Sequence, residues 1–239
     1  MEPIREPLTP DEELIAAQEA GVASKITDEQ RVERMRAELE LGFARLGDLG
    51  GAVTVFGSAR TPEGTAEYDR GVEVGRRLGE VGLAIITGGG PGLMQAANQG
   101  AREAGVPSVG LTIDLPFEQG SNAFLDREVP FHYFFCRKVM FVRYACAFVA
   151  LPGGFGTLDE LFECLTLIQT QKVRDFPVLL VGTDYWGGLV DWLRDKVTAQ
   201  GKIDPEDLAI AELTDDLDLV VQRVLEAAEE QGVQRFARD

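Results

Sequence analysis

The chain has 239 residues, of which 45% are hydrophobic, and it carries a formal net charge of −17 at pH 7. This length and apolar content suffice for one large α/β domain with a full core. The acidic balance argues against a nucleic-acid partner, because affinity for a phosphate backbone comes mostly from clustered Lys and Arg side chains.

Neither a targeting segment nor a membrane span is evident in the sequence. The first residues, MEPIREPLTPDEELIAAQEAG, lack the basic end and apolar core of a signal peptide. The longest apolar run, ACAFVALPGGF, is broken by Pro152 and by glycines, and no run reaches membrane-spanning length. We therefore expect a soluble, cytoplasmic protein with no membrane partner.

Cysteine and histidine are too sparse for a metal centre or a histidine-based catalytic triad. Cys136, Cys146 and Cys164 form no CxxC pair, so buried thiols in a reducing compartment are expected. The single histidine, His132, lies in the aromatic run PFHYFF and is expected to be a packed or surface residue. Acid–base chemistry would then fall to carboxylates, and neither a metal nor a cofactor is expected.

Residues 1–50 are predicted to form an N-terminal helical extension, and residues 51–239 the main domain. The first ~20 residues, rich in Pro and Glu, are expected to be disordered. Asp28 is expected to cap the helix, and the pair Gly50 and Gly51 to end it. Apolar residues recur between them at helical spacing: Val32, Met35, Leu39, Phe43 and Leu46.

After Gly51 the sequence alternates apolar strands, glycine turns and helices. Strands are expected at 52–57, 83–89, 108–113, 131–135, 147–154, 177–182 and 209–214. Helices are expected at 65–80, 92–104, 137–146, 157–171, 186–199 and 215–231. The alternation predicts an α/β fold, a doubly wound parallel sheet with helices on both faces. Such sheets bind ligands at the carboxyl ends of their strands, where this chain places most of its glycine clusters.

The segment TGGGPGLMQAANQGA follows the second strand and opens a helix. The amides of Gly89, Gly90 and Gly92 can point at an anion on the helix axis, where the helix dipole favours negative charge. A plain strand-to-helix turn is the alternative, although it needs fewer glycines. The segment lacks the Gly-Lys-Ser/Thr ending of a Walker loop, and GGFGTLD has Asp159 in place of the third glycine of a dinucleotide fingerprint.

A second glycine loop, LPGGFGTLDELFE, leads into an acidic helix. Thr157 and Glu160 match a capping box, in which Thr157 caps the helix and Glu160 reaches back to the cap amide. Glu163 follows one turn later on the same face. Two carboxylates near a strand end suit acid–base work on a bound ligand, whereas capping and dipole compensation are the alternatives.

Positive charge at the same rim comes from CRKVMF. Arg137 and Lys138 are expected where the fourth strand gives way to a helix. A solvated helix start is the alternative to a role in binding. The helices predicted at 137–146 and 157–171 also carry apolar residues, Phe141, Leu161, Leu165 and Ile168, that we expect near an interface between copies of the chain.

Taken together, GGGPGLMQAAN, the Arg-Lys pair and LPGGFGTLDE resemble the LOG ("lonely guy") family of cytokinin-activating phosphoribohydrolases, over roughly residues 50–232. The N-terminal extension is similar to that of the longer bacterial members. The resemblance implies a Rossmann-like fold and a homodimer or higher homo-oligomer. It also implies hydrolysis of nucleoside 5′-monophosphates, such as cytokinin riboside monophosphate or AMP, to free base and ribose 5-phosphate.

The resemblance also assigns site residues. It implies that Arg137 and Glu160 are catalytic. It places substrate binding at the glycine loops and beside them: Gly57, Ser58, Gly89, Gly90, Gly92, Met94, Lys138, Gly153, Gly154, Gly156, Thr157 and Glu163. The irregular stretch 114–130, with Glu118, Gln119 and Asn122, is a candidate for selecting the base.

The residues fit the implied chemistry. Cleavage of an N-glycosidic bond passes through an oxocarbenium-like sugar, which the Glu160 carboxylate could stabilise or could attack through an activated water. Arg137 could assist the departing base or hold the phosphate. Two other functions stay open: a non-catalytic nucleotide or molybdenum-cofactor carrier, and a general nucleotide nucleosidase with no hormone role. The lysine decarboxylase label that many members carry would need a pyridoxal-binding lysine, which nothing in the sequence indicates.

Overall fold

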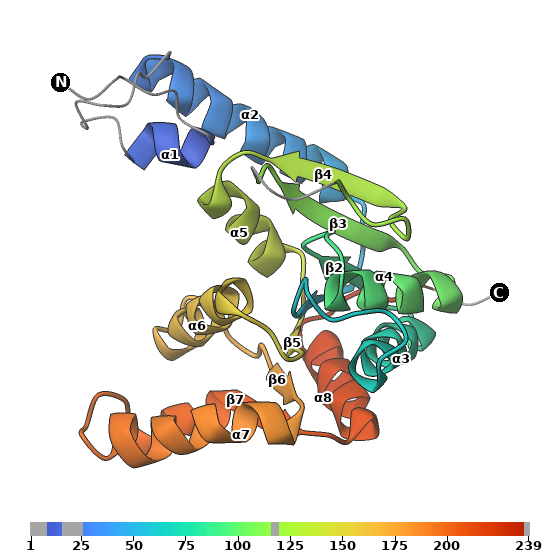
Figure 1. Ribbon diagram of the computed structural model, residues 1–239, viewed down its shortest axis with the longest axis vertical. Helices are drawn as coiled ribbons and strands as arrows, with labels where there is room; N and C mark the ends of the chain where they lie inside the picture. The colour runs from blue at the N-terminus through green and yellow to red at the C-terminus, as the bar shows by residue number, and fades with distance from the viewer. Residues whose placement is uncertain (1–8, 16–25, 116–119, 237–239) are drawn as a thin grey trace.

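The computed structural model describes residues 9–115 and 120–236, apart from residues 16–25. Seven strands form one parallel sheet: β1 (Ala52–Phe56), β2 (Ala84–Thr87), β3 (Ser108–Ile113), β4 (Arg127–Phe131), β5 (Phe148–Ala150), β6 (Val178–Val181) and β7 (Ala211–Thr214). Their spatial order is β4-β3-β2-β1-β5-β6-β7 (Figure 1). The chain therefore builds outward from β1 in one direction and then crosses to the other side with β5.

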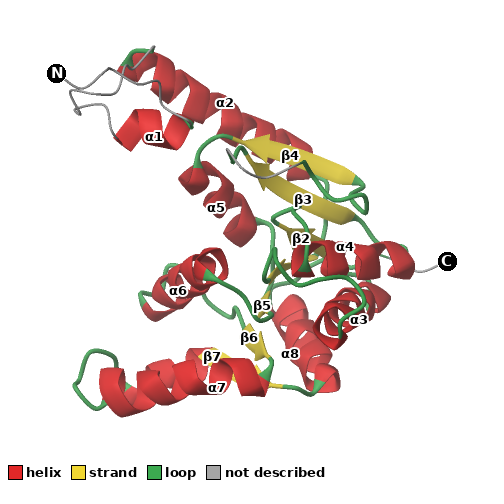
Figure 2. Cartoon of the chain, viewed as in Figure 1, coloured by secondary structure: helices red, strands yellow, loops and turns green. Residues whose placement is uncertain are grey.

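Helices cover both faces of this sheet (Figure 2). On one face lie α3 (Ala66–Glu80), α4 (Leu93–Ala104) and α8 (Leu217–Glu230), packed on Val53, Val55 and Ile85. On the other lie α2 (Asp28–Leu46), α5 (Phe134–Arg143), α6 (Phe155–Gln169) and α7 (Thr183–Trp192), packed on Phe56, Ile86 and their neighbours. Successive strand residues point to opposite faces, so the central strands β1, β2, β5 and β6 contribute to both cores. The predicted fold class is confirmed.

Most predicted elements match the observed ones to within a few residues, with one clear exception. The strand predicted at 131–135 is wrong, because β4 ends at Phe131 and α5 already begins at Phe134. β4 pairs only with β3 and so is an edge strand, where Pro130 is tolerated. The first turn of α5 is held by carboxylates that lie about a hundred residues earlier in the chain, which local sequence patterns cannot reveal.

The helix predicted in the N-terminal extension is present, but its cap and part of its packed face differ from the prediction. Thr27, rather than Asp28, is the N-cap and forms a capping box with Gln30. Val32 is 63% exposed, whereas Leu46 is fully buried. Met35 and Leu39 pack against the same core as Leu46, as their spacing predicts. The buried face also includes Gly42, since a Cβ there would lie 2.7 Å from Met140 Cε, and apolar spacing does not identify this residue.

Two other predictions concern the ends of the chain and its thiols. The disorder expected in the first ~20 residues concerns mainly residues 1–8 and 16–20, which lie outside the described residues, while Pro10–Ile15 form the short helix α1. Cys136, Cys146 and Cys164 are free and buried, as predicted.

Among the described residues no helix combines the length and apolarity needed to cross a membrane. The division of the chain at residue 50 stays a prediction.

Candidate active site

The strand order reverses between β1 and β5, and the glycine loops meet at the carboxyl ends of the strands there. The Ser58 amide, just after β1, donates to Pro152 O in the loop after β5, at 2.9 Å. Ser58 O accepts from the Leu93 amide, at the end of the loop after β2, at 2.8 Å. Three loops predicted to share one site are therefore bonded to one another at the point where doubly wound sheets bind their ligands.

The turn after β2 depends on glycine at specific positions. Gly89 and Gly92 have φ of +75° and +68°, a region that residues with a Cβ rarely adopt. A Cβ at Gly92 would also lie 2.3 Å from Ser58 O, so the close approach of the two loops requires glycine. Met94, half-buried, packs against Gly88, where a Cβ would lie 2.7 Å from its sulfur.

A buried polar network supports this turn from behind. Asn98 of α4, fully buried, accepts from Thr87 Oγ1 at 2.6 Å and donates to Ser108 Oγ at 2.9 Å. The Asn122 amide donates to Gly89 O and Gly90 O, at 3.1 Å each. A fully satisfied network of this kind fixes the turn in one conformation.

This network changes two predictions. The Gly89 amide donates to Thr87 Oγ1 at 2.9 Å, so it is committed inside the fold and not to an anion. Within the described part of the chain, the amides of Gly90 and Gly92 donate to no protein acceptor and stay available. The side chain of Asn122, a candidate for selecting the base, is engaged in anchoring the turn, while Glu118 and Gln119 lie outside the described residues.

The capping box predicted for Thr157 and Glu160 is wrong. The helix α6 begins at Phe155, and its N-cap is Gly154 in an extended conformation without a side-chain cap bond. Thr157 is therefore the third helical residue, and its buried side chain lies against Gly153, where a Cβ would be 2.1 Å from Thr157 Oγ1. Gly154 and Gly156 face open space. Glu160 lies in the second turn, beyond reach of the cap amide.

Glu160 is a buried carboxyl group with a strongly shifted pKa. Its exposed fraction is 6%. Burial raises the pKa of Glu160 to about 7, against the opposing charges of Lys138 and Arg137, and the carboxylates of Glu163 and Asp159 add to the rise. A carboxyl group that titrates near neutral pH at a ligand-binding edge is typical of an acid–base catalyst.

Lys138 joins α5 to α6 by ion pairs. Its Nζ lies 2.9 Å from Asp159 Oδ1 and 2.8 Å from Glu163 Oε2, and its side chain is 15% exposed. Burial lowers the pKa of Lys138, but the bonds to Glu163 and Asp159 and the charge of Glu160 outweigh it and leave that pKa raised. Lys138 and Glu163, both predicted to bind substrate, are thus paired with each other beside Glu160.

Arg137 extends from the first turns of α5 to the glycine turn. Its guanidinium carbon lies 5.0 Å from the ring centre of Phe134 and 5.4 Å from that of Phe141. Its Nη1 is 3.9 Å from the place a Cβ would take on Gly88. The next residue, Lys138, pairs with Asp159 and Glu163, which precede and follow Glu160 on α6, so Arg137 and Glu160 share the same edge of the sheet. The structure therefore brings together the two residues predicted to be catalytic.

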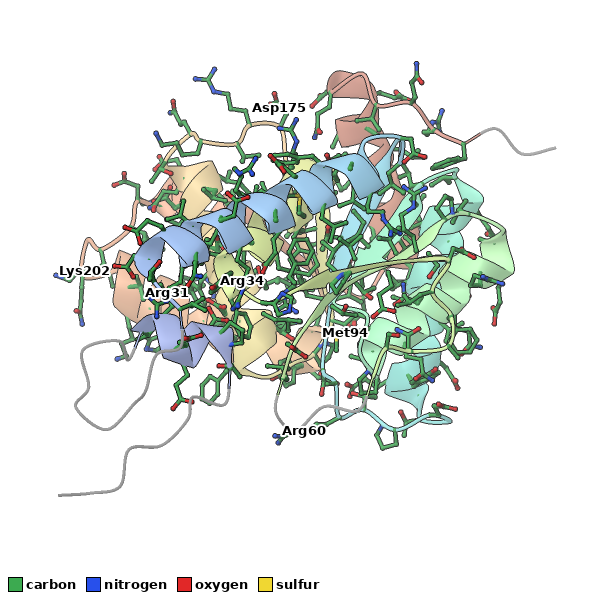
Figure 3. The ribbon with its side chains drawn as sticks, turned by 90° about the horizontal axis from the view of Figure 1, so that it is seen from above. Arg31, Arg34, Arg60, Met94, Asp175 and Lys202 are labelled. Atoms are coloured by element: carbon green, nitrogen blue, oxygen red, sulfur yellow. The ribbon has the colours of Figure 1, made fainter. Side chains whose placement is uncertain are left out.

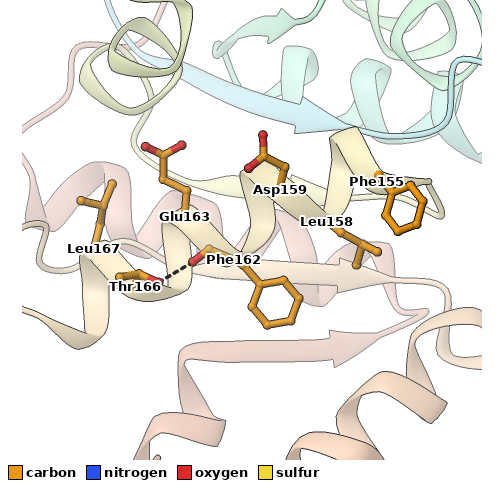
Figure 4. Close-up of a pocket in the computed structure, with 7 residues that line it drawn as sticks. All are labelled: Phe155, Leu158, Asp159, Phe162, Glu163, Thr166 and Leu167. Carbon is orange, nitrogen blue, oxygen red and sulfur yellow. Dashed lines mark hydrogen bonds between the residues drawn. The ribbon is translucent and has the colours of Figure 1, made fainter. Parts of the chain in front are cut away.

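The surface of α6 carries an open groove of about 710 Å³ that begins at Phe155 in the glycine loop after β5. Figure 4 shows Asp159 and Glu163 on one side of the helix, and Leu158 and Phe162 on the other. The groove is lined by Phe155, Leu158, Asp159, Phe162, Glu163, Thr166 and Leu167, all from this helix. Phe155 is 91% exposed at its end. The groove is an apolar helix surface beside the site.

Sequence reasoning did not identify the residues that hold the loops in place. Asn98 lies between alanines on the buried side of its helix, and a polar residue at such a position is the signal that was available. From α7, Tyr185 donates to Gly153 O at 2.6 Å and Trp186 donates to Ala150 O at 3.2 Å. No local pattern marks these two aromatic residues as supports of the loop after β5.

Comparison with known proteins identifies the family. The family model described as "possible lysine decarboxylase" matches residues 94–224, more than half of the chain. A cytokinin riboside 5′-monophosphate phosphoribohydrolase of Arabidopsis thaliana is 31% identical over 159 residues, which cover 64% of this chain and 72% of that protein. The chain belongs to the LOG family. A probable cytokinin riboside 5′-monophosphate phosphoribohydrolase from Oryza sativa subsp. japonica is 30% identical over 184 residues, which cover 74% of this chain and 77% of that protein.

Solved structures place this LOG family chain in the same fold. An X-ray structure from a structural genomics consortium matches with a TM-score of 0.55 and 26% identity, covering 74% of this chain and 99% of that one. The molybdenum cofactor carrier protein of Chlamydomonas reinhardtii matches with a TM-score of 0.57 and 21% identity, covering 75% and 99%. The LOG family fold is thus shared with a carrier protein, and fold alone does not assign an activity.

Proposed function

We propose that the protein is a phosphoribohydrolase that cleaves the N-glycosidic bond of nucleoside 5′-monophosphates, releasing free base and ribose 5-phosphate. Cytokinin riboside monophosphate and AMP are the proposed substrates. The observation that carries the proposal is the buried Glu160 carboxyl group, with its pKa raised to about 7, beside Arg137 at the reversal of strand order. The names of the relatives support it at the level of the family.

The proposed reaction assigns one step to each residue. The bond from C1′ of the ribose to the base breaks, and its electron pair leaves with the base. Ionised Glu160 stabilises the positive charge that develops at C1′ and takes a proton from the water that attacks there. Arg137, which is charged at all relevant pH values, stabilises the departing base or the phosphate. Water supplies the hydroxyl group of ribose 5-phosphate, and the proton that Glu160 takes from it passes to the base, which restores the carboxylate.

The phosphate of the substrate is proposed to bind at the N-terminus of α4. The amides of Gly90 and Gly92 lie there, and the dipole of this twelve-residue helix favours an anion. The network of Thr87, Asn98 and Asn122 holds these amides in place before any ligand binds. Such preorganisation reduces the entropy that binding must overcome.

The residues do not fit the lysine decarboxylase activity that the family model's description suggests. A pyridoxal-binding lysine must lose its proton to form a Schiff base. Lys138, the partly buried lysine of this edge, has a raised pKa and two carboxylate partners, so it stays protonated. The other described lysines, Lys172, Lys196 and Lys202, are exposed.

A substrate panel tests the proposal and the choice of base. The protein is incubated with AMP, GMP, CMP, UMP and isopentenyladenosine monophosphate, and released base and ribose 5-phosphate are measured. We expect release from adenine nucleotides, and the ratio between the isopentenyl and the plain compound identifies the physiological class. A carrier would release neither product from any member of the panel.

The pH dependence of the reaction should follow Glu160. The pKa of Glu160 is raised, so the carboxylate needed for catalysis is lost as pH falls through about 7. We expect kcat/KM to rise with pH through this value and then level off. The second ionisation of the substrate phosphate, at ~6, also contributes. Lys138→Met separates the two, because it leaves the substrate unchanged but raises the pKa of Glu160 further.

In Lys138→Met, we therefore expect the acidic limb of the profile to move to higher pH. Wild-type and variant profiles are measured in the same buffers with AMP as substrate. A limb that stays in place, or one that lies at the ordinary pKa of a carboxyl group in both proteins, would exclude Glu160 as the titrating base.

We further propose that the protein is a homodimer or a higher homo-oligomer. The interface residues predicted on α5 and α6 need revision, because Phe141 and Leu161 are buried in the core of one chain. The same helices instead expose Phe135 and Val139 on α5 and Phe155 and Phe162 on α6. Large apolar side chains gathered beside a site are typical of a surface that a second copy covers.

Light scattering at micromolar concentration should therefore give at least twice the chain mass of 26.1 kDa. Replacing Phe155 by Asp should shift that mass toward a single chain, since a charge would then be buried in the interface. A wild-type protein that is strictly monomeric would contradict this proposal.

A further inference from the structure

The first turn of α5 is capped from a distance. Its own N-cap residue, Tyr133, makes no side-chain cap bond. Instead, Glu38 of α2 accepts from the amides of His132 and Tyr133, at 3.1 and 3.2 Å, through one carboxylate oxygen. Its other oxygen lies 3.0 Å from His132 Nδ1. Asp11 of α1 accepts from the Phe134 amide at 3.3 Å.

These contacts hold a charged group inside the protein. Glu38 is 5% exposed, and a buried carboxylate is tolerated only where hydrogen bonds replace the lost water. At the N-terminus of a helix the negative carboxylate also interacts favourably with the positive end of the helix dipole. Moving α5 away from α2 would leave the carboxylate and two backbone amides without partners. The contacts of Glu38 therefore fix the position of α5 relative to α2.

The short helix α1 is held against α2 in a similar way. Arg31, which Figure 3 labels on α2, is 4% exposed and contacts Asp28 at 2.6 Å and Glu13 at 3.8 Å. Leu14 adds an apolar contact with the core. These contacts place Asp11 at the start of α5. Burial raises the pKa of Asp11, the Phe134 amide and the charge of Arg137 lower it, and the charge of Glu38 adds to the rise.

We infer that Glu38, with Asp11 in support, is a positioning residue for Arg137: the helices before the sheet fix the first turn of α5 and thereby the guanidinium at the glycine turn. Arg137 is the fourth residue of α5, so its backbone lies within one turn of the capped amides. A displacement of about 1 Å of a substrate-contacting group can cost a hundredfold in rate. The inference rests on the proposed function for its effect on turnover, but not for its effect on the helix.

Hydrogen exchange tests the effect on the helix without any substrate. In Glu38→Ala, the amides of His132, Tyr133 and the first turn of α5 should exchange faster than in the wild type, while those of α4 are unchanged. Glu40→Ala is the matched control, because Glu40 lies on the same helix but is exposed and pairs only with Arg36 among the described residues. Equal exchange at α5 in the two variants would overturn the inference.

Turnover of AMP tests the effect on Arg137. We expect Glu38→Ala to lower kcat by about ten- to a hundredfold, and Glu40→Ala to leave it unchanged. In an Arg137→Ala background, Glu38→Ala should cause no further loss, because both changes remove the same contribution. A loss that is equally large with and without Arg137 would show general destabilisation and contradict the inference.

Asp11→Ala provides a second variant if Glu38→Ala does not fold. It removes one carboxylate from the same turn and should show faster exchange at Phe134, a smaller loss of kcat and the same dependence on Arg137. If the wild type cleaves no nucleotide, the proposed function fails, and the exchange data alone decide whether Glu38 holds α5. Unchanged exchange in Asp11→Ala and Glu38→Ala would refute the inference even in an active enzyme.

Discussion

Glu160→Gln is expected to lower turnover of AMP by about a hundredfold or more, the range associated with loss of a general base or of a preorganised charge. Gln keeps the shape of the side chain but cannot become negative. It therefore neither stabilises an oxocarbenium-like sugar nor accepts a proton from water. Glu160 makes no capping contact in the structure, so the loss cannot be assigned to a disturbed helix start.

The same variant should be at least as stable as the wild type. The pKa of Glu160 is raised to about 7 in the fold, above its ordinary value of 4.5. The folded chain therefore binds more protons than the unfolded chain between these values, and the stability that Glu160 contributes is lost as pH rises through about 7. Gln stays neutral and avoids this loss, so its advantage in melting temperature should grow as pH rises from 4.5 to about 7 and stay constant at higher pH.

Asp159→Asn is the matched control for Glu160→Gln. Asp159 is the preceding residue of the same helix, but its side chain is 56% exposed and pairs with Lys138. Its replacement should change turnover little at neutral pH, because Glu160 remains ionisable. A Glu160→Gln protein with turnover near the wild type would refute the mechanism and favour a carrier function.

The second large effect is expected when the phosphate group is removed from the substrate. Nucleoside 5′-monophosphates should be cleaved with a kcat/KM at least about a hundredfold above that of the matching nucleosides, because binding energy from a remote group is expressed in rate as well as affinity. The structure supplies the remote contact through the Gly90 and Gly92 amides at the start of α4. The measurement compares AMP with adenosine under the same conditions.

Asn122→Ala should reduce that preference for the phosphate. It removes the side-chain bonds to Gly89 O and Gly90 O and leaves only the backbone bond from residue 122 to Gly89 O, so the amides of the turn are held less firmly in one direction. The ratio of AMP to adenosine cleavage should fall, while adenosine cleavage itself changes little. Ser121→Ala is the control, since Ser121 is exposed and donates to Glu128. Equal cleavage of AMP and adenosine by the wild type would show that the glycine segment is only a turn.

The alternation of apolar strands and helices was sufficient to predict the parallel sheet and the edge where the glycine loops meet. Such patterns are local, and the loops need only follow their strands to converge. The first turn of α5 could not be predicted in this way, because Glu38 and Asp11 cap it from other helices. Without that information, the aromatic run PFHYFF has the composition of a strand.

The candidate site was predicted in its location but not in its internal contacts. The sequence placed Arg137 and Glu160 at one edge through motifs that the family shares. It also indicated a capping box that is absent, because Gly154 lets α6 begin two residues before Thr157. The pairing of Lys138 with Glu163 and the role of Asn122 depend on how distant segments meet, which spacing along one element does not encode.

The fate of a stoichiometric ligand distinguishes a hydrolase from a carrier. Wild-type protein is mixed with an equal amount of AMP or of isopentenyladenosine monophosphate, and the free and protein-bound fractions are separated and identified by mass spectrometry. We predict equimolar free base and ribose 5-phosphate, with intact nucleotide persisting only in the Glu160→Gln protein. Intact nucleotide bound to the wild type after many hours, with no ribose 5-phosphate in either fraction, would contradict the account.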